Sequence, residues 1–369
     1  MPTRPSIPAE IERHILTESG HRCAVCGASC PLERAHIVPW HRSKQHNAED
    51  LICLCALCHE RADLEQWGEA TLREYKARPW VHRQSDFVSH VKFENALELE
   101  PWRLHAPRMV RIPAGRFKMG SWGREDGRGD ETEHEVRITH IFEMAIMPVT
   151  QMWWQEVMGN NPSQFKGHDH PVECVSWYDA VAFCNQLSAR CELPAAYTIE
   201  DLEGSPGLVD FKATVAWRLD SAGFRLPTEA EWEYACRAGS SGPTYNGYPF
   251  EYDPIAWILS NSDGCTHPVG KKEPNAWGLH DMLGNVHEWV WDWYDDYSAG
   301  PVVNPTGPSI AKADQYTGSF KKLHRGGAWH CIKWRARCAE RHTQPPTFRE
   351  GYQKIGRGDS IGFRLARSV

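Results

Sequence analysis

The sequence of 369 residues lacks any run of about 18 apolar residues, the length that a helix needs to cross a bilayer. Its first eight residues contain no apolar core of the kind found in secretory signal peptides. It also lacks an excess of positive charge, since the formal net charge is −7, so no general attraction draws it to nucleic acid or anionic membranes. No internal repeat or low-complexity tract is present. We therefore expect a cytoplasmic protein without a membrane partner.

Cysteine, tryptophan, proline and glycine are all well represented. The 13 cysteines are an odd number, and four of them form two Cys-x-x-Cys pairs, which favours metal-bound and free thiols over a disulfide framework. The 25 prolines and 29 glycines predict many turns and short elements. The 17 tryptophans can pack such a loop-rich fold, because each indole buries a large area with few rotatable bonds.

The local patterns predict a mixed α+β protein with more than one domain. Apolar periodicity and stop signals predict helices, and short apolar runs between Gly and Pro turns predict strands, whereas residues 192–222 have no strong pattern. We place a small metal domain at 1–80, a linker with partial structure at 81–107 and a larger domain at 108–369. The expected helices cover 8–19, 64–77, 151–158 and 177–189, and the expected strands cover 110–112 and 135–138.

The four paired cysteines predict a structural zinc site. Cys23 and Cys26 form one pair, and Cys55 and Cys58 form the other about thirty residues later. Four thiolates at this spacing are typical of a closed tetrahedral Zn²⁺ site, and the metal would supply folding energy to a small segment.

Between and after these pairs lie residues suited to phosphodiester chemistry. His36 follows Arg34-Ala35, while His59 and Asp63 are separated by one helical turn and share a face. Together with Asp50, this arrangement resembles the HNH endonucleases, which have a ββα-metal fold. The resemblance implies that His36 is the general base, that Asp50, His59 and Asp63 complete the catalytic set with a divalent ion such as Mg²⁺, and that DNA or another nucleic acid is the partner.

Ala35 departs from the HNH pattern, because many relatives carry a metal-binding Asp or His immediately before the base. The alternative interpretation is therefore an inert zinc ribbon that only folds or docks. Any contact with DNA would depend on local basic residues, namely Arg34, Arg42 and Lys44, rather than on a broad basic face.

Dense motifs in a fixed order mark the larger domain. They include Arg325-Gly-Gly-Ala-Trp329, a terminal Gly362-Phe-Arg364 and longer segments at 109–120, 170–179, 223–235 and 275–289. This set resembles the formylglycine-generating enzyme, or sulfatase-modifying factor, family, and it implies a loop-rich variant of the C-type lectin fold. Arg225, Glu229, Trp232, Trp289, Trp293 and Arg364 are expected to pack or pair inside that fold.

The same resemblance bears on activity and metals. Active members of the family oxidise a substrate cysteine at a copper site made by two cysteines five residues apart, but here Cys331 is followed at that spacing by Ala336. We therefore expect neither copper nor formylglycine-generating activity.

The family also binds structural Ca²⁺ near the Gly-Asn-x-x-Glu-Trp turn, which implies ligands from Asp281, Gly284, Val286 and Glu288. A hydrogen-bonded turn without metal is the alternative.

The segment 330–361 also resembles the variable part of proteins diversified by retroelements, which use this lectin-like fold as a ligand-binding scaffold. It lies between Gly-Gly-Ala-Trp and Gly-Phe-Arg, and it mixes aromatic, basic and polar residues without helical or strand periodicity. The resemblance implies a recognition surface for an unknown protein or small ligand. The alternative is an ordinary surface loop. The implied contact residues are His330, Cys331, Ile332, Trp334, Arg335, Glu340, His342, Gln344, Phe348, Arg349, Tyr352 and Lys354.

Three functions follow from these patterns. The first, which we favour from the sequence, is a metal-dependent HNH-type endonuclease coupled to a lectin-like recognition module. The second is a non-catalytic ligand-binding protein with a structural zinc ribbon. The third, which Ala336 disfavours, is a formylglycine-generating oxidase.

Overall fold

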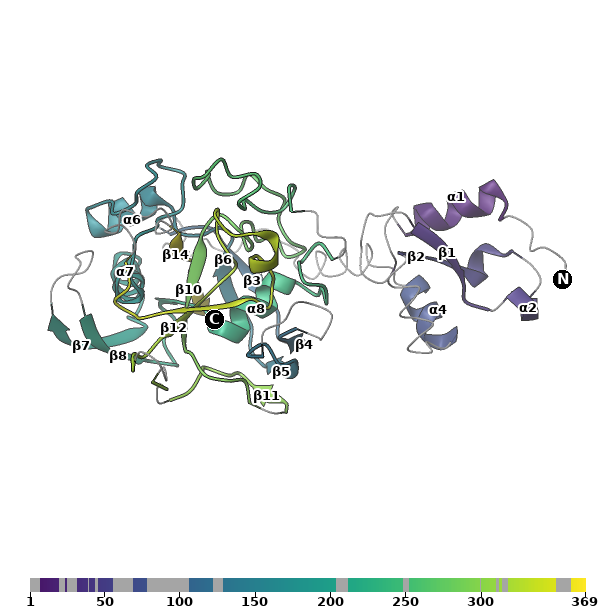
Figure 1. The fold of residues 1–369 in the computed structure, drawn as a ribbon. Coiled ribbons are helices and arrows are strands. Elements are labelled where there is room, and N and C mark those ends of the chain that lie inside the picture. The colour runs from purple at the N-terminus through teal and green to yellow at the C-terminus, as the bar shows by residue number, and fades with distance from the viewer. Residues whose placement is uncertain are drawn as a thin grey trace. The chain divides into compact units, whose positions relative to one another are not determined.

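The computed structural model divides the chain into two compact units. One comprises Met1–Asn95 with Asn246–Pro249, and the other comprises Ala96–Tyr245 with Phe250–Val369. Figure 1 shows the elements of each unit. The described residues are 7–19, 24, 32–38, 40–43, 46–55, 69–77, 106–121, 129–203, 212–247, 252–298, 300–309, 312–313, 318–349 and 360–369.

The N-terminal unit contains an antiparallel pair of strands with helices before and after it. The strands β1 (Leu32–His36) and β2 (Leu51–Cys55) pair so that His36 lies opposite Leu51. Ile15 packs against Leu51 and Cys53 in a small core. The helical elements of this unit are α1 (Ala9–Glu18), α2 (Trp40–Ser43), η1 (Ala48–Asp50) and α4 (Glu69–Ala77).

Ion pairs connect the helices of the N-terminal unit. Arg73 on α4 donates to the Asp50 carboxylate at 2.9 Å, and Lys76 on the same helix pairs with Glu18 of α1. These pairs are partly exposed, so each contributes at most about 1 kcal/mol. They fix the orientation of α4 more than they stabilise the unit.

The C-terminal unit is built from small sheets joined by long loops. Two four-stranded sheets have the orders β13-β12-β10-β14 and β3-β6-β15-β9, beside a three-stranded sheet, β11-β5-β4, and the hairpin β7-β8. The strands are β3 (Met109–Ile112), β4 (Gly115–Met119), β5 (His134–Ile138), β6 (Phe142–Ala145), β7 (Tyr197–Glu203), β8 (Lys212–Trp217), β9 (Phe224–Arg225), β10 (His287–Trp293), β11 (Val302–Val303), β12 (Lys322–Arg325), β13 (Arg341–Gln344), β14 (Ile361–Phe363) and β15 (Ala366–Ser368).

Three α-helices of this unit begin at side-chain caps. They are α6 (Gln151–Met158), α7 (Trp177–Arg190) and α8 (Glu229–Arg237), and a short 3-10 helix, η3 (Lys333–Arg335), lies farther along the chain. The Ser176 side chain accepts a hydrogen bond from the Asp179 amide, and Asp179 accepts in return from the Ser176 amide. Thr228 and Glu231 form the same capping box on α8. Each box satisfies two amides that a helix would otherwise leave without partners.

The main core lies where α6 and α7 meet the end of the chain. Trp154 stacks on Phe183 with ring centroids 5.5 Å apart, and Phe363 of β14 meets both rings edge-on. All three side chains are essentially inaccessible to solvent. Large rings with few rotatable bonds therefore fill the space between short elements, as the tryptophan content predicts.

The predicted helices at 151–158 and 177–189 are confirmed, and the strand at 110–112 falls within β3. Residues 192–222, in which the sequence shows no strong pattern, contain both strands of the hairpin β7-β8. The described part of the chain has no helix that is both long and apolar enough to cross a membrane.

Candidate functional site

The N-terminal constellation is only partly within the described residues. His36 ends β1, and Asp50 directly precedes β2, where Arg73 binds one of its carboxylate oxygens. The predicted zinc ligands Cys23, Cys26 and Cys58, like His59 and Asp63, lie outside the described residues, and Cys55 is described only as the last residue of β2. The zinc site and the catalytic set therefore stay predictions.

In the C-terminal unit, the signature residues form a buried network of ion pairs that we call the frame. Arg225 binds Glu231 at 2.6 and 2.8 Å through two guanidinium nitrogens. Arg337 binds Glu131 in the same way, at 2.9 Å for both contacts, across 206 residues of sequence. Buried ion pairs with two or more hydrogen bonds connect loop segments that no helix or sheet holds together. The frame pairs are Arg225–Glu231, Arg325–Glu233, Arg337–Glu131, Arg341–Glu229 and Arg364–Glu288.

The expectation that Arg225, Glu229, Trp232, Trp289, Trp293 and Arg364 pack or pair inside the fold is confirmed. Trp232 and Trp289 are fully buried, and Trp232 donates to Glu288 at 2.6 Å. Trp293 contributes one of three indole faces around the Lys322 ammonium, at 3.9 Å from its ring centroid.

The predicted calcium ligands do not fit a calcium ion in this arrangement. The two Glu288 oxygens accept from Arg364 at 2.7 and 2.8 Å, and one of them also accepts from Trp232. Asp281 accepts from the Gly270 amide at 2.6 Å. A cation at the turn would face the Arg364 guanidinium, whereas Ca²⁺ needs six to eight free oxygen ligands. The alternative of a hydrogen-bonded turn fits better.

The Gly-Gly-Ala-Trp turn places the start of the segment 330–361 against the frame. Gly327 has φ +74°, and a Cβ there would lie 2.6 Å from the Arg335 carbonyl oxygen and 2.8 Å from Ala336. Only glycine tolerates both the left-handed backbone and this close approach. The turn therefore packs closely against the end of η3.

The two thiols nearest the family's copper position do not converge on each other. Cys338 lies with its sulfur 3.4 Å from that of Cys236, and both are fully buried. Cys331 instead lies 3.6 Å from Nε2 of His287. Burial raises the pKa of the Cys331 thiol to about 11, so it is protonated at neutral pH.

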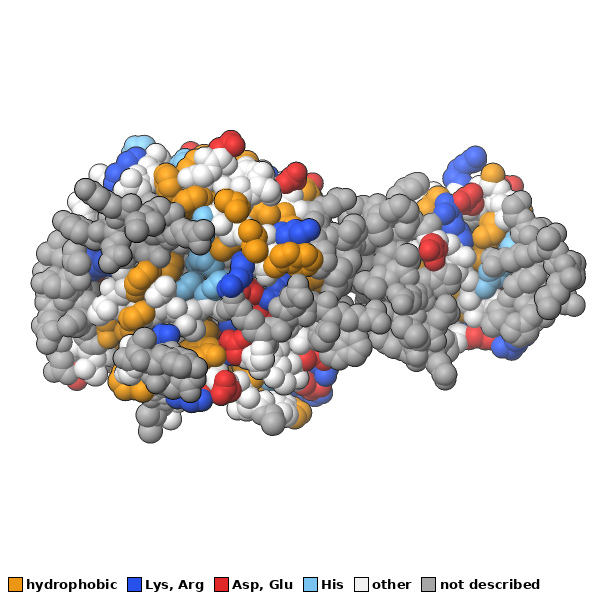
Figure 2. Space-filling view, viewed as in Figure 1, with side chains coloured by type: hydrophobic (Ala, Val, Ile, Leu, Met, Phe, Trp, Pro, Cys, Tyr) orange, Lys and Arg blue, Asp and Glu red, His pale blue; other side chains and the backbone are white. Residues whose placement is uncertain are grey.

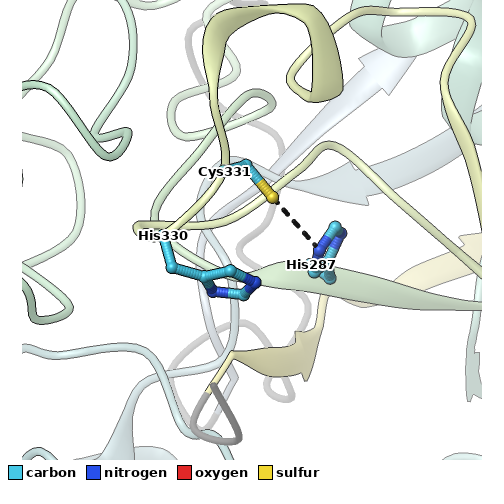
Figure 3. A group of neighbouring side chains, drawn as sticks. All are labelled: His287, His330 and Cys331. Atoms are coloured by element: carbon cyan, nitrogen blue, oxygen red, sulfur yellow. Dashed lines mark hydrogen bonds between the residues drawn. The ribbon is translucent and has the colours of Figure 1, made fainter. Parts of the chain in front are cut away.

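Cys331 belongs to a group that we call the histidine cluster, and Figure 3 shows three of its members. His324 and His342 lie directly opposite each other on β12 and β13 and stack with centroids 5.4 Å apart. The His287 ring approaches both, at 4.6 and 4.5 Å. The cluster consists of His287, His324, His330, Cys331 and His342.

The histidine cluster is electrically neutral at its centre. Burial, followed by the neighbouring imidazoles, holds the pKa of His287 and of His324 well below the usual range. Among the described residues, His324 has both ring nitrogens buried without a hydrogen-bond partner. Neutral imidazoles beside a thiol are the donor set that zinc and copper prefer.

An apolar groove of about 780 Å³ lies beside the cluster. Its lining includes three large apolar side chains that are exposed to solvent, namely Leu259 (55%), Ile332 (51%) and Trp334 (38%). The Leu259 amide donates to the Cys331 carbonyl at 3.0 Å, which joins the two walls. We call this the groove; it is lined by Tyr252, Asp253, Pro254, Ile258, Leu259, Ser260, Ile332, Lys333 and Trp334.

Figure 2 shows one face of the molecule, on which histidine side chains gather beside hydrophobic ones in the C-terminal unit. Contiguous exposed apolar surface of this kind is typical of a ligand-binding site. The size of the groove is within the range of small-molecule and peptide sites, roughly 300–1,000 Å³.

The twelve implied contact residues fall into four groups. Ile332 and Trp334 line the groove, and Arg335 is exposed next to them. His330, Cys331 and His342 belong to the histidine cluster. Tyr352 and Lys354 lie outside the described residues.

The remaining four serve the scaffold more than the surface. Glu340 is fully buried and pairs with Arg337, so its assignment as a contact residue is wrong. Phe348 packs against the main core, and Arg349 pairs with the buried Asp179. Gln344 ends β13, which pairs with β12 although the segment 330–361 shows no strand periodicity.

Sequence reasoning missed the other wall of the groove and the role of His287. Tyr252, Pro254, Ile258 and Leu259 come from a loop about 75 residues upstream of Ile332. The sequence around Leu259 has no amphipathic pattern, so it offered no local signal for this wall.

Comparison with known proteins gives a consistent result. The family model described as "Sulfatase-modifying factor enzyme 1-like domain" matches residues 95–369. The chaperone protein LppX of Paenibacillus barcinonensis is 38% identical over 283 residues, covering 70% of this chain and 89% of that protein. The formylglycine-generating enzyme of Bos taurus is 30% identical over 238 residues, which is 60% of this chain but only 50% of the bovine protein.

Among solved structures, Treponema denticola variable protein 1 is similar with a TM-score of 0.60 and 32% sequence identity. The similarity covers 71% of this chain and 95% of that protein. A lectin-like module of this type therefore accounts for the C-terminal unit, while residues 1–94 lie outside the family match.

Proposed function

Because this chain belongs to the sulfatase-modifying factor family, we propose that its C-terminal unit is a non-catalytic member that binds a ligand in the groove. The observation that carries the proposal is the exposure of Ile332, Trp334 and Leu259 together around one cavity. Leaving large apolar side chains in water is unfavourable by about 25 cal/mol per Å². A ligand that covers them recovers this free energy.

Side-chain hydrogen bonds hold the backbone around the groove, which supports a preformed binding site. Asn261 accepts from the Ile258 amide at 2.8 Å, and Ser262 donates to the Trp329 carbonyl at 2.8 Å. A preformed site loses little conformational entropy on binding. The similarity to a variable protein supports the further interpretation that exposed positions within 330–361, such as Ile332 and Trp334, differ between copies, whereas Arg337 and Arg341 belong to the unchanged frame.

The chemistry of the nearby thiols disfavours an oxidase. Cys338 contacts Cys236, whereas Cys331 lies 3.6 Å from Nε2 of His287. A copper site of two thiolates needs both sulfurs at one point. We therefore do not propose the formylglycine-generating activity of the bovine relative for this chain.

The ligand-binding proposal can be tested with a displayed library of random peptides. Peptides selected on the whole protein should lose about 5- to 30-fold in affinity on Trp334→Ala, since truncating an aromatic hot spot costs about 1–2 kcal/mol. Phe320→Ala is the matched control, because Phe320 is also an exposed aromatic (50%) but does not line the groove. Selected peptides that bind both variants equally would place recognition elsewhere.

A second candidate function is favoured by the N-terminal unit. We infer a metal-dependent nuclease from the order strand, strand, helix, with His36 at the end of β1 and Asp50 just before β2. A divalent ion held by Asp50 and the predicted ligands His59 and Asp63 would stabilise the charge on the scissile phosphate. His36 would then accept a proton from the attacking water.

Plasmid nicking in Mg²⁺, Mn²⁺, Ni²⁺ or Zn²⁺ tests this candidate. His36→Ala should lower the cleavage rate by about 10²- to 10⁴-fold, the usual contribution of a general base. His14→Ala is the control, because His14 is exposed on α1 and away from β1 in sequence. Absence of cleavage by the unaltered protein with every metal would favour the inert zinc ribbon and leave the ligand-binding proposal intact.

A further inference from the structure

The histidine cluster contains three potential metal ligands that already lie close together. His287 comes from the first residue of β10, and His330 and Cys331 follow the Gly-Gly-Ala-Trp turn. One ligand atom from each of the three lies within 4.8 Å of the other two. Figure 3 shows the Cys331 sulfur directed at the His287 ring, with His330 on the neighbouring stretch of loop.

The separation of two of these atoms matches a tetrahedral zinc site. Zinc binds sulfur at about 2.3 Å and imidazole nitrogen at about 2.1 Å, so tetrahedral geometry places the two ligand atoms about 3.6 Å apart. The distance from Cys331 Sγ to His287 Nε2 is 3.6 Å. These two side chains therefore need little movement to share one metal ion.

The surroundings also suit a metal. His287 and Cys331 are more than nine-tenths buried, whereas His330 is partly exposed and marks the side from which an ion can enter. His324 stands 4.6 Å from the His287 ring by centroid, with ring nitrogens that make no hydrogen bond in the described structure.

From this geometry we propose that His287, His330 and Cys331 bind a Zn²⁺ ion, with a fourth position left for water or for a group of the bound ligand. Three protein ligands with an open position are typical of zinc sites that interact with small molecules. The site is separate from the predicted Cys23, Cys26, Cys55 and Cys58 set. This proposal does not depend on the proposed function, because its test measures metal binding alone.

The competing explanation is a simple hydrogen bond between the thiol and the imidazole within a packed cluster. The two explanations differ in metal content, so metal content is the measurement. The N-terminal cysteines are a second expected zinc site, and the test therefore uses the full chain carrying Cys23→Ser and Cys26→Ser. That background removes two of the four predicted thiolates from the other site.

The protein is stripped of metal and titrated with Co²⁺, whose absorption reports both tetrahedral geometry and thiolate ligation, and then with Zn²⁺ while bound ions are counted by native mass spectrometry. The background protein should bind one ion with a thiolate-to-cobalt band. Adding Cys331→Ser should abolish that band. Adding Cys265→Ser should leave it, because Cys265 is a partly exposed free thiol outside the cluster.

His330→Ala provides a variant less prone to misfolding, because His330 is the partly exposed ligand. It should weaken zinc binding by more than the roughly 10- to 100-fold that loss of an outer partner causes. Tryptophan fluorescence checks that each variant is folded. Equal metal content and equal spectra in the background protein, Cys331→Ser and His330→Ala would overturn the proposal and leave the thiol–imidazole hydrogen bond.

Discussion

The buried pair Glu288–Arg364 offers the sharpest test of how this fold is held together. Arg364 is fully buried and Glu288 is 1% exposed. Two guanidinium nitrogens of Arg364 donate to the two carboxylate oxygens of Glu288. The substitution Glu288→Gln keeps the shape of the side chain and an acceptor for Trp232. It removes the negative charge and leaves the Arg364 cation buried without its partner.

The expected loss follows from the desolvation of that cation. Removing one partner of a buried pair lowers the free energy of unfolding by about 3–5 kcal/mol. Arg364 also donates to the Ala145 and His280 carbonyls, at 2.9 and 2.8 Å, and these bonds offset only part of the loss. The double variant Glu288→Gln with Arg364→Met should be more stable than the sum of the single losses predicts, by about 1–3 kcal/mol.

Urea unfolding followed by tryptophan fluorescence measures the change, because 17 tryptophans report on the fold. The matched control is Glu133→Gln, since Glu133 forms a surface pair with Lys118 at 3.6 Å. That control should change stability by less than about 1 kcal/mol. Equal effects of the two substitutions would refute the role assigned to the buried pair. A rise in the unfolding midpoint on adding Ca²⁺ to the unaltered protein would support the predicted calcium site at this turn.

Two further predictions concern buried positions of the same unit. Burial, followed by the nearby Glu229, raises the pKa of Asp292 to about 8, so the folded state keeps a proton that the unfolded state releases above about pH 4. Stability should therefore fall as the pH rises from about 4 to 8, and Asp292→Asn should flatten that slope in urea midpoints measured across this range. Gly327→Ala should lower the melting temperature more than Gly159→Ala does, since both have positive φ but only Gly327 has backbone atoms within 3 Å of the added Cβ.

The helices were the most predictable part of this fold. The predicted bounds 151–158 coincide with those of α6, and the Ser176 cap marks where α7 begins. These signals are local, because a helix satisfies its own backbone within four residues. The hairpin β7-β8 was missed, because its strands pair with each other and the pattern within each one is weak.

The site was less predictable because it is assembled from distant segments. The sequence marked 330–361 as the recognition segment, and Ile332 and Trp334 do line the groove. The local sequence could not show that Glu340 is buried. Its partner Arg337 is held by Glu131, which lies 206 residues from Arg337 in the sequence. The histidine cluster depends on the register that sets His324 opposite His342, and register is a property of paired strands, not of either strand alone.

The place of β15 within its sheet has a consequence for how the protein is made. This strand, Ala366–Ser368, lies between β6 and β9 and pairs with both, while β14 pairs in parallel with β10. Each four-stranded sheet thus includes a strand from residues 361–368. Neither sheet can close until the ribosome has released residues 361–368, and contacts between segments so distant in sequence make that closure slow.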